Sequence, residues 1–214
     1  MSTTAQAAIW GFLAGLPLIV GAAIAIWKRP SDRAVGLVAA LGAGALVSSV
    51  AYELVEEAAG HADPWLLGLS LATGALVYFF GDRALSRGGD SSRGLALLLG
   101  ATLDGIPESL ILGISIASGG GVSVAYFAAI VLSNFPEGMA SAAELKDDPD
   151  FGTRRLLLMW TGVVGVSAVF ASLGGWLGSD ASTEVTVIAN AFAAGALLTM
   201  VTVDLVPEAD ENAG

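Results

Sequence analysis

The stretch from Ala7 to Trp27, AAIWGFLAGLPLIVGAAIAIW, contains no charged residue and decides the class of fold. An α-helix needs about 20 consecutive apolar residues to cross the hydrocarbon core of a bilayer. The run ends at Lys28 and Arg29, and no basic residue precedes it. Because a cleaved signal peptide carries its positive charge before its apolar run, we expect this segment to be retained as a first transmembrane helix.

Six further blocks of similar length follow, and together they predict an all-α membrane protein. The chain is 55% hydrophobic and 14% charged, whereas soluble domains usually carry about 25% charged residues. We therefore expect a single polytopic transmembrane domain over residues 1–214 with about seven transmembrane helices. They are predicted at residues 7–27, 34–58, 64–83, 94–118, 122–146, 155–178 and 184–208.

The basic residues predict how these helices are oriented. All nine lie at the connections between the first and second, third and fourth, and fifth and sixth helices, which share one side of the bilayer. Lys and Arg accumulate in cytoplasmic loops, so we expect the N-terminus outside and the C-terminus in the cytoplasm, in the cytoplasmic membrane of a prokaryote. The basic residues are Lys28, Arg29, Arg33, Arg83, Arg87, Arg93, Lys146, Arg154 and Arg155.

Composition excludes several classes of site and partner. The chain has no cysteine, which excludes disulfides and thiolate metal ligands. Its net charge of −11 argues against a nucleic-acid partner. The acidic excess is either solvated loop charge or a means of attracting cations. The expected partners are therefore the lipid bilayer and cations.

Two segments repeat each other at opposite ends of the chain. They are GALVSSVAYELVEEA at residues 44–58 and GALLTMVTVDLVPEA at residues 195–209, and eight of their fifteen positions are identical. Both contain an acidic pair at four-residue spacing. An odd number of crossings separates the two predicted helices, so they should run in opposite directions as an inverted repeat, a common construction in secondary transporters. The pairs are Glu53 with Glu57 and Asp204 with Glu208.

Two similar motifs lie near the centres of the predicted helices 94–118 and 122–146. They are DGIPES at residues 104–109 and SNFPEG at residues 133–138. A carboxylate at the centre of a membrane helix costs about 2.5–3.5 kcal/mol, and a proline inside a soluble helix costs about 3 kcal/mol. One explanation is structural, with proline kinking the helix and glutamate bonding a polar neighbour. The occurrence of both costs on two neighbouring helices favours a functional site.

The functional interpretation is a divalent-cation site at the bilayer midplane. The prolines free the carbonyls of Leu103 and Leu132, and unwound carbonyls can coordinate cations. Three close carboxylates in a low dielectric cannot all stay ionised, so cation binding should release protons, and we hypothesise that transport is coupled to proton movement. The predicted ligands are Asp104, Glu108, Ser133, Asn134 and Glu137.

Other polar residues predict a transport path on both sides of this site. Ser141 and Glu144 share the helix face of Glu137, and Glu144 either lines a cytoplasmic exit or caps a solvated helix end. The acidic pairs of the repeat lie toward opposite sides of the membrane. The predicted path consists of Glu53, Glu57, Ser141, Glu144, Asp204 and Glu208.

The two motifs resemble those of the ZIP (Zrt-/Irt-like protein) family of divalent metal transporters, and the chain is identified as a divergent member. Family members carry His-Asn-x-Pro-Glu-Gly on the fourth helix and a related polar-polar-x-Pro-Glu-Gly on the fifth. The resemblance implies that Glu108 and Glu137 are bridging glutamates, that Asp104 replaces a histidine ligand, and that Ser133 and Asn134 occupy polar ligand positions. It also implies uptake toward the cytoplasm, a homodimer, and one helix bundle sliding against the other.

Departures from the family pattern bear on the metal and on the length of the chain. An all-oxygen site without histidine favours Mn, Fe(II), Mg or Ca over Zn. Carboxylates also bind Zn, and the substrate cation is left open among Zn, Mn and Fe(II). Gly105 replaces the asparagine of the motif, and no acid lies on the helix 155–178. The family has eight helices, so a chain with seven is either a fragment or a short member.

Two alternatives to transport are also considered. A membrane metal-binding sensor or scaffold would use the same ligands without moving the ion. A membrane-embedded metal-dependent hydrolase would need a general base and an open metal position, but His61, the single histidine, is predicted in a loop. We therefore expect a transporter and not an enzyme.

Overall fold

The computed structural model contains helices and no strand in its described part, which is the whole chain except residues 29, 87–92, 120, 147–150 and 214. The side chains at 85–86, 93–98 and 144 are also outside the description. Seven long helical spans occur in this part, and each coincides with a predicted helix to within a few residues. The elements are α1 Thr3–Lys28, α2 Asp32–Ser49, η1 Val50–Val55, α3 Glu56–Ala59, α4 Pro64–Ser86, α5 Arg93–Ala117, α6 Val124–Leu145, α7 Thr153–Ser179, α8 Thr183–Met200, η2 Val201–Leu205 and α9 Val206–Ala213.

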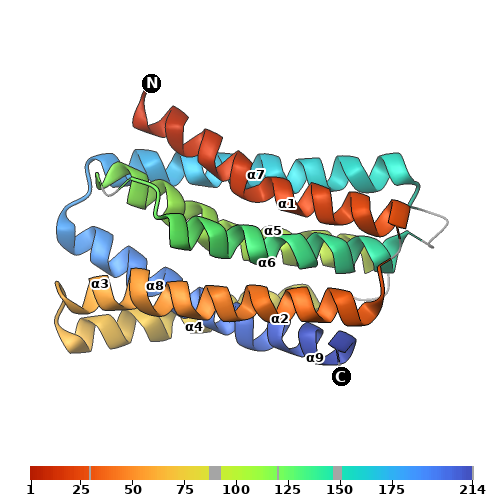
Figure 1. Ribbon diagram of the computed structural model, residues 1–214. Coiled ribbons are helices and arrows are strands. Elements are labelled where there is room, and N and C mark those ends of the chain that lie inside the picture. Colours follow the sequence, from red (N-terminus) through yellow and green to blue (C-terminus); the bar gives the residue numbers. More distant parts are fainter. Residues whose placement is uncertain (29, 87–92, 120, 147–150, 214) are drawn as a thin grey trace.

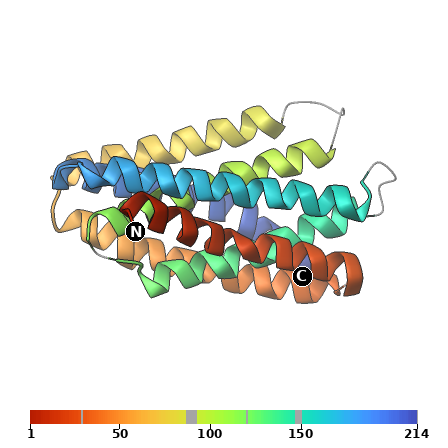
Figure 2. The same ribbon diagram turned by 90° about the horizontal axis from the view of Figure 1, so that it is seen from above.

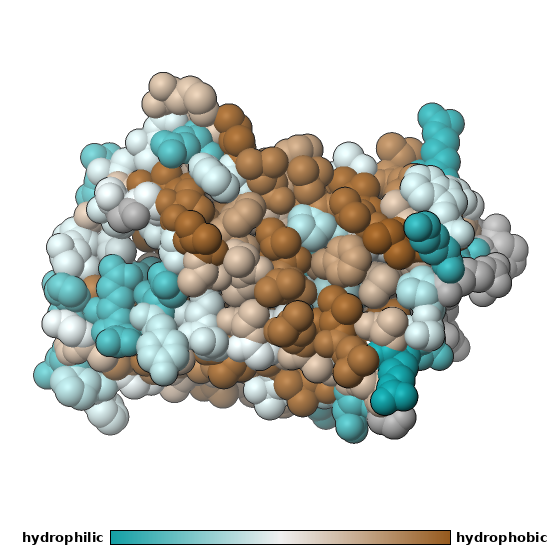
Figure 3. Space-filling model, viewed as in Figure 1, coloured by the Kyte–Doolittle hydropathy of each residue, from teal (hydrophilic) through white to brown (hydrophobic). Residues whose placement is uncertain are grey.

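The length and composition of these spans fit a membrane. Six spans within the described residues are long and apolar enough to cross a bilayer. The seventh, α6, is not among them, because Ser133, Asn134 and Glu137 near its centre lower its hydropathy. Hydrophobic side chains form a band across the middle of the face seen in Figure 3, and hydrophilic side chains gather at both ends. The chain is therefore an integral membrane protein, and the expected all-helical fold is confirmed.

The helices form two bundles that lie against each other as layers (Figure 1). The first bundle consists of α1, α5, α6 and α7, and the second of α2, α4 and α8 with the short segments η1, α3, η2 and α9. Contact between the bundles runs mainly through α2 and α6, with smaller contacts from α5 to α4 and α8. In Figure 2 the long helices follow roughly one direction, with the N- and C-termini toward opposite ends. This placement of the termini is what an odd number of spans requires.

The internal repeat of the sequence is also a repeat of structure. Each copy is interrupted by a short π-helical segment, η1 in the first copy and η2 in the second. The two segments begin at equivalent repeat positions, Val50 and Val201, and each contains the first acid of its pair, Glu53 or Asp204. The two copies run in opposite directions in Figure 1, as an inverted repeat should. Because π-helical turns are rare and occur frequently at functional sites, these acids are good candidates for a functional role.

Glycine allows the closest approach between helices of the first bundle. A Cβ atom at Gly113 of α5 would overlap the carbonyl oxygen of Ala171, and one at Gly174 of α7 would overlap the carbonyl oxygen of Leu110. Small residues let membrane helices pack backbone against backbone. The position of α5, which carries two of the predicted cation ligands, therefore depends on this contact.

We expect Gly174→Ala to destabilise the protein, because its methyl group would overlap a backbone carbonyl that has no alternative rotamer. Overpacking costs about 1–3 kcal/mol, and each kcal/mol lowers the unfolding midpoint of a chain of this size by about 2–4 °C. Thermal unfolding of the detergent-purified protein measures the effect. Gly165→Ala on the same helix is the matched control, since nothing lies within 4 Å of its added methyl; an equal loss in both variants would contradict the packing argument.

Candidate metal site

Glu108 is held by α5 at a point where polar groups of α6 approach it. Its side chain is only 2% exposed, and Oε1 accepts a hydrogen bond of 3.3 Å from the hydroxyl of Ser133. The hydroxyl of Tyr126 donates to the backbone carbonyl of Glu108 over 3.3 Å. Side chains from α5 and α6 therefore meet at this buried carboxyl.

Glu137 and Asn134 present further oxygen atoms from α6. Oε1 of Glu137 is buried and has no hydrogen-bond partner in the described part of the chain. Asn134 is 4% exposed, and its Nδ2 donates to the carbonyl of Ala14 in α1 over 2.9 Å, which leaves Oδ1 as the atom able to bind a cation. A buried carboxyl oxygen without a donor is costly, and a bound cation would satisfy it.

Asp104 is engaged by a tyrosine of the other bundle. Tyr78 of α4 is 4% exposed. Its hydroxyl contacts Oδ1 of Asp104 and lies 2.7 Å from Oδ2 of Asp204. Because the hydroxyl carries one proton, it is shared between the two carboxyls or donated to one of them at a time. Asp104 belongs to the first bundle, whereas Tyr78 and Asp204 belong to the second. The three side chains therefore form a hydrogen-bonded connection between the bundles, which we call the Tyr78 bridge.

The three predicted acidic ligands lie near one another but do not converge on one point. The carboxyls of Asp104, Glu108 and Glu137 interact electrostatically with one another. Even so, the described residues contain no group of three His, Asp or Glu side chains arranged to hold a metal ion.

The backbone around the two prolines differs from the expectation that the helices unwind there. Both α5 and α6 continue as α-helices through Pro107 and Pro136, and the irregular turns lie instead in η1 and η2. The carbonyl oxygen of Leu132 packs against α2, where a Cβ atom at Gly42 would lie 2.6 Å from it. Neighbouring helices make such prolines tolerable inside a membrane. We therefore do not count the carbonyl of Leu132 among the ligands, whereas that of Leu103, which receives no N–H from Pro107, stays a prediction.

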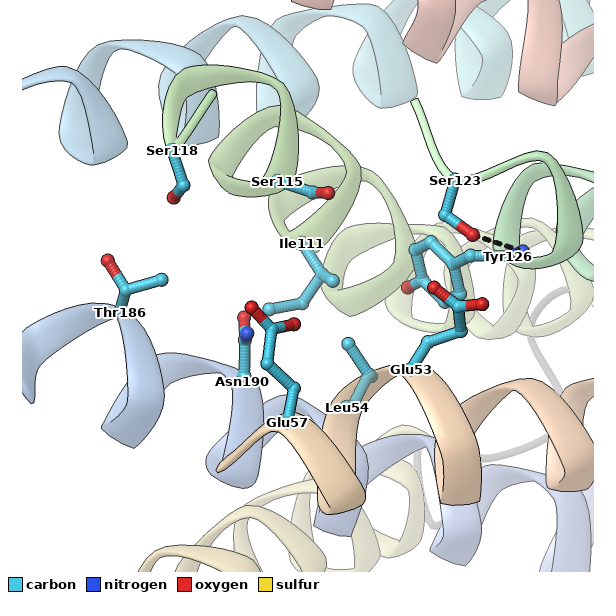
Figure 4. A pocket seen from close by; sticks show the side chains of 10 residues that line it. All are labelled: Glu53, Leu54, Glu57, Ile111, Ser115, Ser118, Ser123, Tyr126, Thr186 and Asn190. Carbon is cyan, nitrogen blue, oxygen red and sulfur yellow. Dashed lines mark hydrogen bonds between the residues drawn. The ribbon is translucent and has the colours of Figure 1, made fainter. Parts of the chain in front are cut away.

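A cavity of about 200 Å³ lies beside the first copy of the repeat (Figure 4). Glu53 of η1 and Glu57 of α3 extend into it, and Asn190 of α8 lies beside Glu57. Tyr126, which bonds the backbone of Glu108, also lines this cavity, so its inner end lies close to the buried carboxyl. The lining also includes the hydroxyls of Ser115, Ser118, Ser123 and Thr186. Such oxygen-rich walls suit hard divalent cations.

A second cavity of about 520 Å³ is lined by Ser141 of α6 and Glu208 of α9, among others. Along α6, the chain passes from Ser123 at the first cavity, through the centre that carries Glu137, to Ser141 at the second. The two cavities therefore lie on opposite sides of the buried carboxyls. The side chain of Glu144, also predicted on this path, is outside the described residues.

The sequence analysis missed Tyr78, Tyr126 and Asn190. A signal for the first exists, because Tyr78 and Asp82 are four residues apart on an otherwise apolar helix and so share a face. Tyr126 and Asn190 are single polar residues in apolar segments, and nothing in their surroundings marks them. Their part in the site becomes visible only when the helices are packed together.

Buried carboxyls between two cavities of a membrane helix bundle are typical of an ion transporter. A comparison with protein families identifies the kind, since residues 81–214 match the family described as ZIP Zinc transporter. This match covers more than half of the chain, and the chain therefore belongs to the ZIP family, whose members transport divalent metals such as zinc and are not enzymes. A search of curated proteins found no match.

Proposed function

We propose that the chain moves a divalent cation across the membrane toward the cytoplasm, and that the cation binds at Glu108 and Glu137 near the bilayer midplane. Asp104, Ser133 and Asn134 complete the ligand set. The observation that carries the proposal is the buried Oε1 of Glu137, which has no hydrogen-bond partner among the described residues. A cation is the partner that best offsets the cost of burying a carboxylate.

The two cavities supply the path. Under the orientation that the basic loops predict, the cavity of Glu53 and Glu57 faces outside and the cavity of Ser141 and Glu208 faces the cytoplasm. The sliding of one bundle against the other, which the family resemblance implies, would expose the central carboxyls to each cavity in turn. The homodimer implied by the same resemblance stays a prediction, to be tested by the mass of the purified particle.

The ligand set favours Mn or Fe(II) over Zn. Every proposed side-chain ligand offers oxygen, and oxygen donors suit Mn and other hard cations, whereas imidazole and thiolate suit Zn. Zinc accepts carboxylate ligands as well, so all three ions belong in the assay. The proposal concerns the order of preference and not the exclusion of zinc.

Cation uptake into proteoliposomes is the test. Vesicles with wild-type protein or Glu108→Ala would be offered Mn, Fe(II), Zn and Cd. We expect uptake with the wild type and a loss of about 100-fold in the variant, because removing one partner of a buried charge pair costs about 3–5 kcal/mol. Glu184→Ala is the matched control, since it removes an exposed carboxyl at the start of α8, and it should keep wild-type uptake.

Binding measured on the same samples separates transport from the alternative. Cation bound without uptake would identify a sensor or scaffold, and the absence of both would contradict the proposal. Uptake can also be measured with an imposed pH gradient, with the vesicle interior either more acidic or more alkaline. Rates that do not respond would remove proton coupling and leave cation transport intact.

A further inference from the structure

We propose that Tyr78 is a positioning residue for the cation site: it ties Asp104 to Asp204 across the two bundles and keeps Asp104 out of the ligand set until a cation competes for it. This inference rests on the proposed function of Asp104 as a ligand. The contacts on which it rests, however, join side chains of the protein and involve no cation.

The bridge adds a hydrogen-bonded contact to the packing between the two bundles. Tyr78 and Asp204 come from α4 and η2 of the second bundle, and Asp104 comes from α5 of the first. The tyrosine is 4% exposed, and its hydroxyl reaches both carboxyls. A hydrogen bond to a charged group inside a low dielectric is stronger than one in water. The bridge is therefore a specific contact between the bundles.

An apolar cavity of about 280 Å³ lies beside Tyr78, lined by residues of α4, α5, α7 and α8 that include Val77, Leu103 and Ala193. Tyr78 itself packs in a cluster of buried apolar residues from both bundles, among them Ile111 and Ala196. Apolar packing beside the bridge is therefore incomplete, and a gap forfeits contact energy. The hydrogen bonds of Tyr78 add a directional contact between the bundles to this packing.

The bridge also explains why the cation site is incomplete. With Asp104 held by Tyr78, the described residues offer no three acidic side chains that close on one point. Asp104 also interacts electrostatically with Asp204, Asp82 and Glu208. These groups carry charge of the same sign, and their repulsion weakens the binding of Asp104 within the Tyr78 bridge. A divalent cation near Glu108 and Glu137 offers Asp104 a better partner. Binding would then complete the site and at the same time release the tie between the bundles.

Tyr78→Phe tests the first half of this proposal, because it removes the hydroxyl and keeps the ring. Releasing Asp104 should make Mn²⁺ bind about tenfold more tightly, the lower end of what a hydrogen bond to a charged group contributes. Titration of the purified protein followed by the electron paramagnetic resonance of free Mn²⁺ measures this. In an Asp104→Asn background the same change should have no effect. Unchanged affinity in Tyr78→Phe, or an equal gain in the Asp104→Asn background, would overturn the proposal.

Tyr52→Phe is the matched control for this titration. It removes the same hydroxyl from a side chain that is 71% exposed on η1. We expect wild-type Mn²⁺ affinity in this variant. A general effect of losing a tyrosine hydroxyl would shift both variants alike, and that result would also overturn the proposal.

Cross-linking tests the second half without any transport assay. The chain has no cysteine, so Gly81→Cys with Leu103→Cys introduces a single reactive pair; the side chain of Leu103 lies 3.6 Å from a Cβ atom built at Gly81. A short bifunctional thiol reagent should then link α4 to α5. We expect the rate of linking to fall at least about threefold when Tyr78→Phe or Asp204→Ala breaks the bridge. Adding Mn²⁺ to protein that retains Tyr78 should slow the linking in the same way. Equal rates in all samples would overturn the tie. A Tyr78-dependent rate in a protein that takes up no cation would contradict the proposed function and leave the bridge standing.

Discussion

Replacing Glu137 by glutamine should abolish cation uptake while leaving the fold as stable as before. Glutamine has nearly the shape of glutamate but carries no charge. A divalent cation in the site would lose one of its charged partners, and leaving such a charge uncompensated costs about 3–5 kcal/mol, or roughly 10²- to 4 × 10³-fold in affinity. Stability should not fall, because the wild-type carboxyl has a buried oxygen without a hydrogen-bond partner in the described part of the chain. Replacing a buried charge by a neutral group is often neutral or stabilising.

A loss of uptake without a loss of stability makes the experiment decisive. Uptake into proteoliposomes and the thermal unfolding midpoint would be measured on the same preparation of Glu137→Gln. The exposed Glu184→Gln controls for the general effect of neutralising an acid and should change neither quantity. Wild-type uptake in Glu137→Gln would remove this residue from the site. A large drop in its unfolding midpoint would instead assign it a structural role.

The seven spans were predictable because the bilayer imposes one simple requirement on each of them. Every span must be apolar over about 20 residues, so length and hydropathy placed the helices to within a few residues. Short connections between the spans make neighbouring helices antiparallel. The inverted repeat was visible because both copies keep their acidic pairs. The π-helical turns were not predictable, since Val50–Val55 and Val201–Leu205 read as ordinary helix in hydropathy and propensity.

The candidate site was predictable only where the sequence breaks a rule of membrane helices. Glu108 and Glu137 stand out because each is an acid beside a proline in an apolar run, which has a recognisable cost. Tyr78 breaks no such rule, and its four-residue spacing from Asp82 is the one sign that the sequence offers. Its importance comes from the packing of α4 against α5, which brings its hydroxyl to two acids far away in sequence. The expected unwinding at the prolines failed for the related reason that neighbouring helices support α5 and α6 through those positions.

In the function that we propose, Asp104 would connect the choice of metal with the movement of the bundles. It is the position at which the chain departs from the histidine of the family motif, and it is also the acid that the Tyr78 bridge holds. A carboxylate can accept the tyrosine hydroxyl and can bind a hard cation, but it cannot do both fully with the same oxygen. On our proposal, aspartate in place of histidine would therefore change two properties together: the preference for the cation and the strength of the contact that a bound cation would break.

Asp104→His is accordingly expected to shift the preference of the transporter from Mn toward Zn. Imidazole is a better ligand for Zn than for Mn, whereas carboxylate suits Mn. A difference of about 1.4 kcal/mol between the two ions would change the ratio of their uptake by about tenfold. Competition between Mn and Zn in proteoliposomes measures this ratio directly. Asp104→Asn is the control for loss of charge alone, and it should weaken uptake of both ions while leaving the ratio near that of the wild type. If Asp104→His kept the wild-type ratio, Asp104 would not contact the transported ion, and the ligand set would have to be built from Glu108, Glu137 and the polar groups of α6 alone.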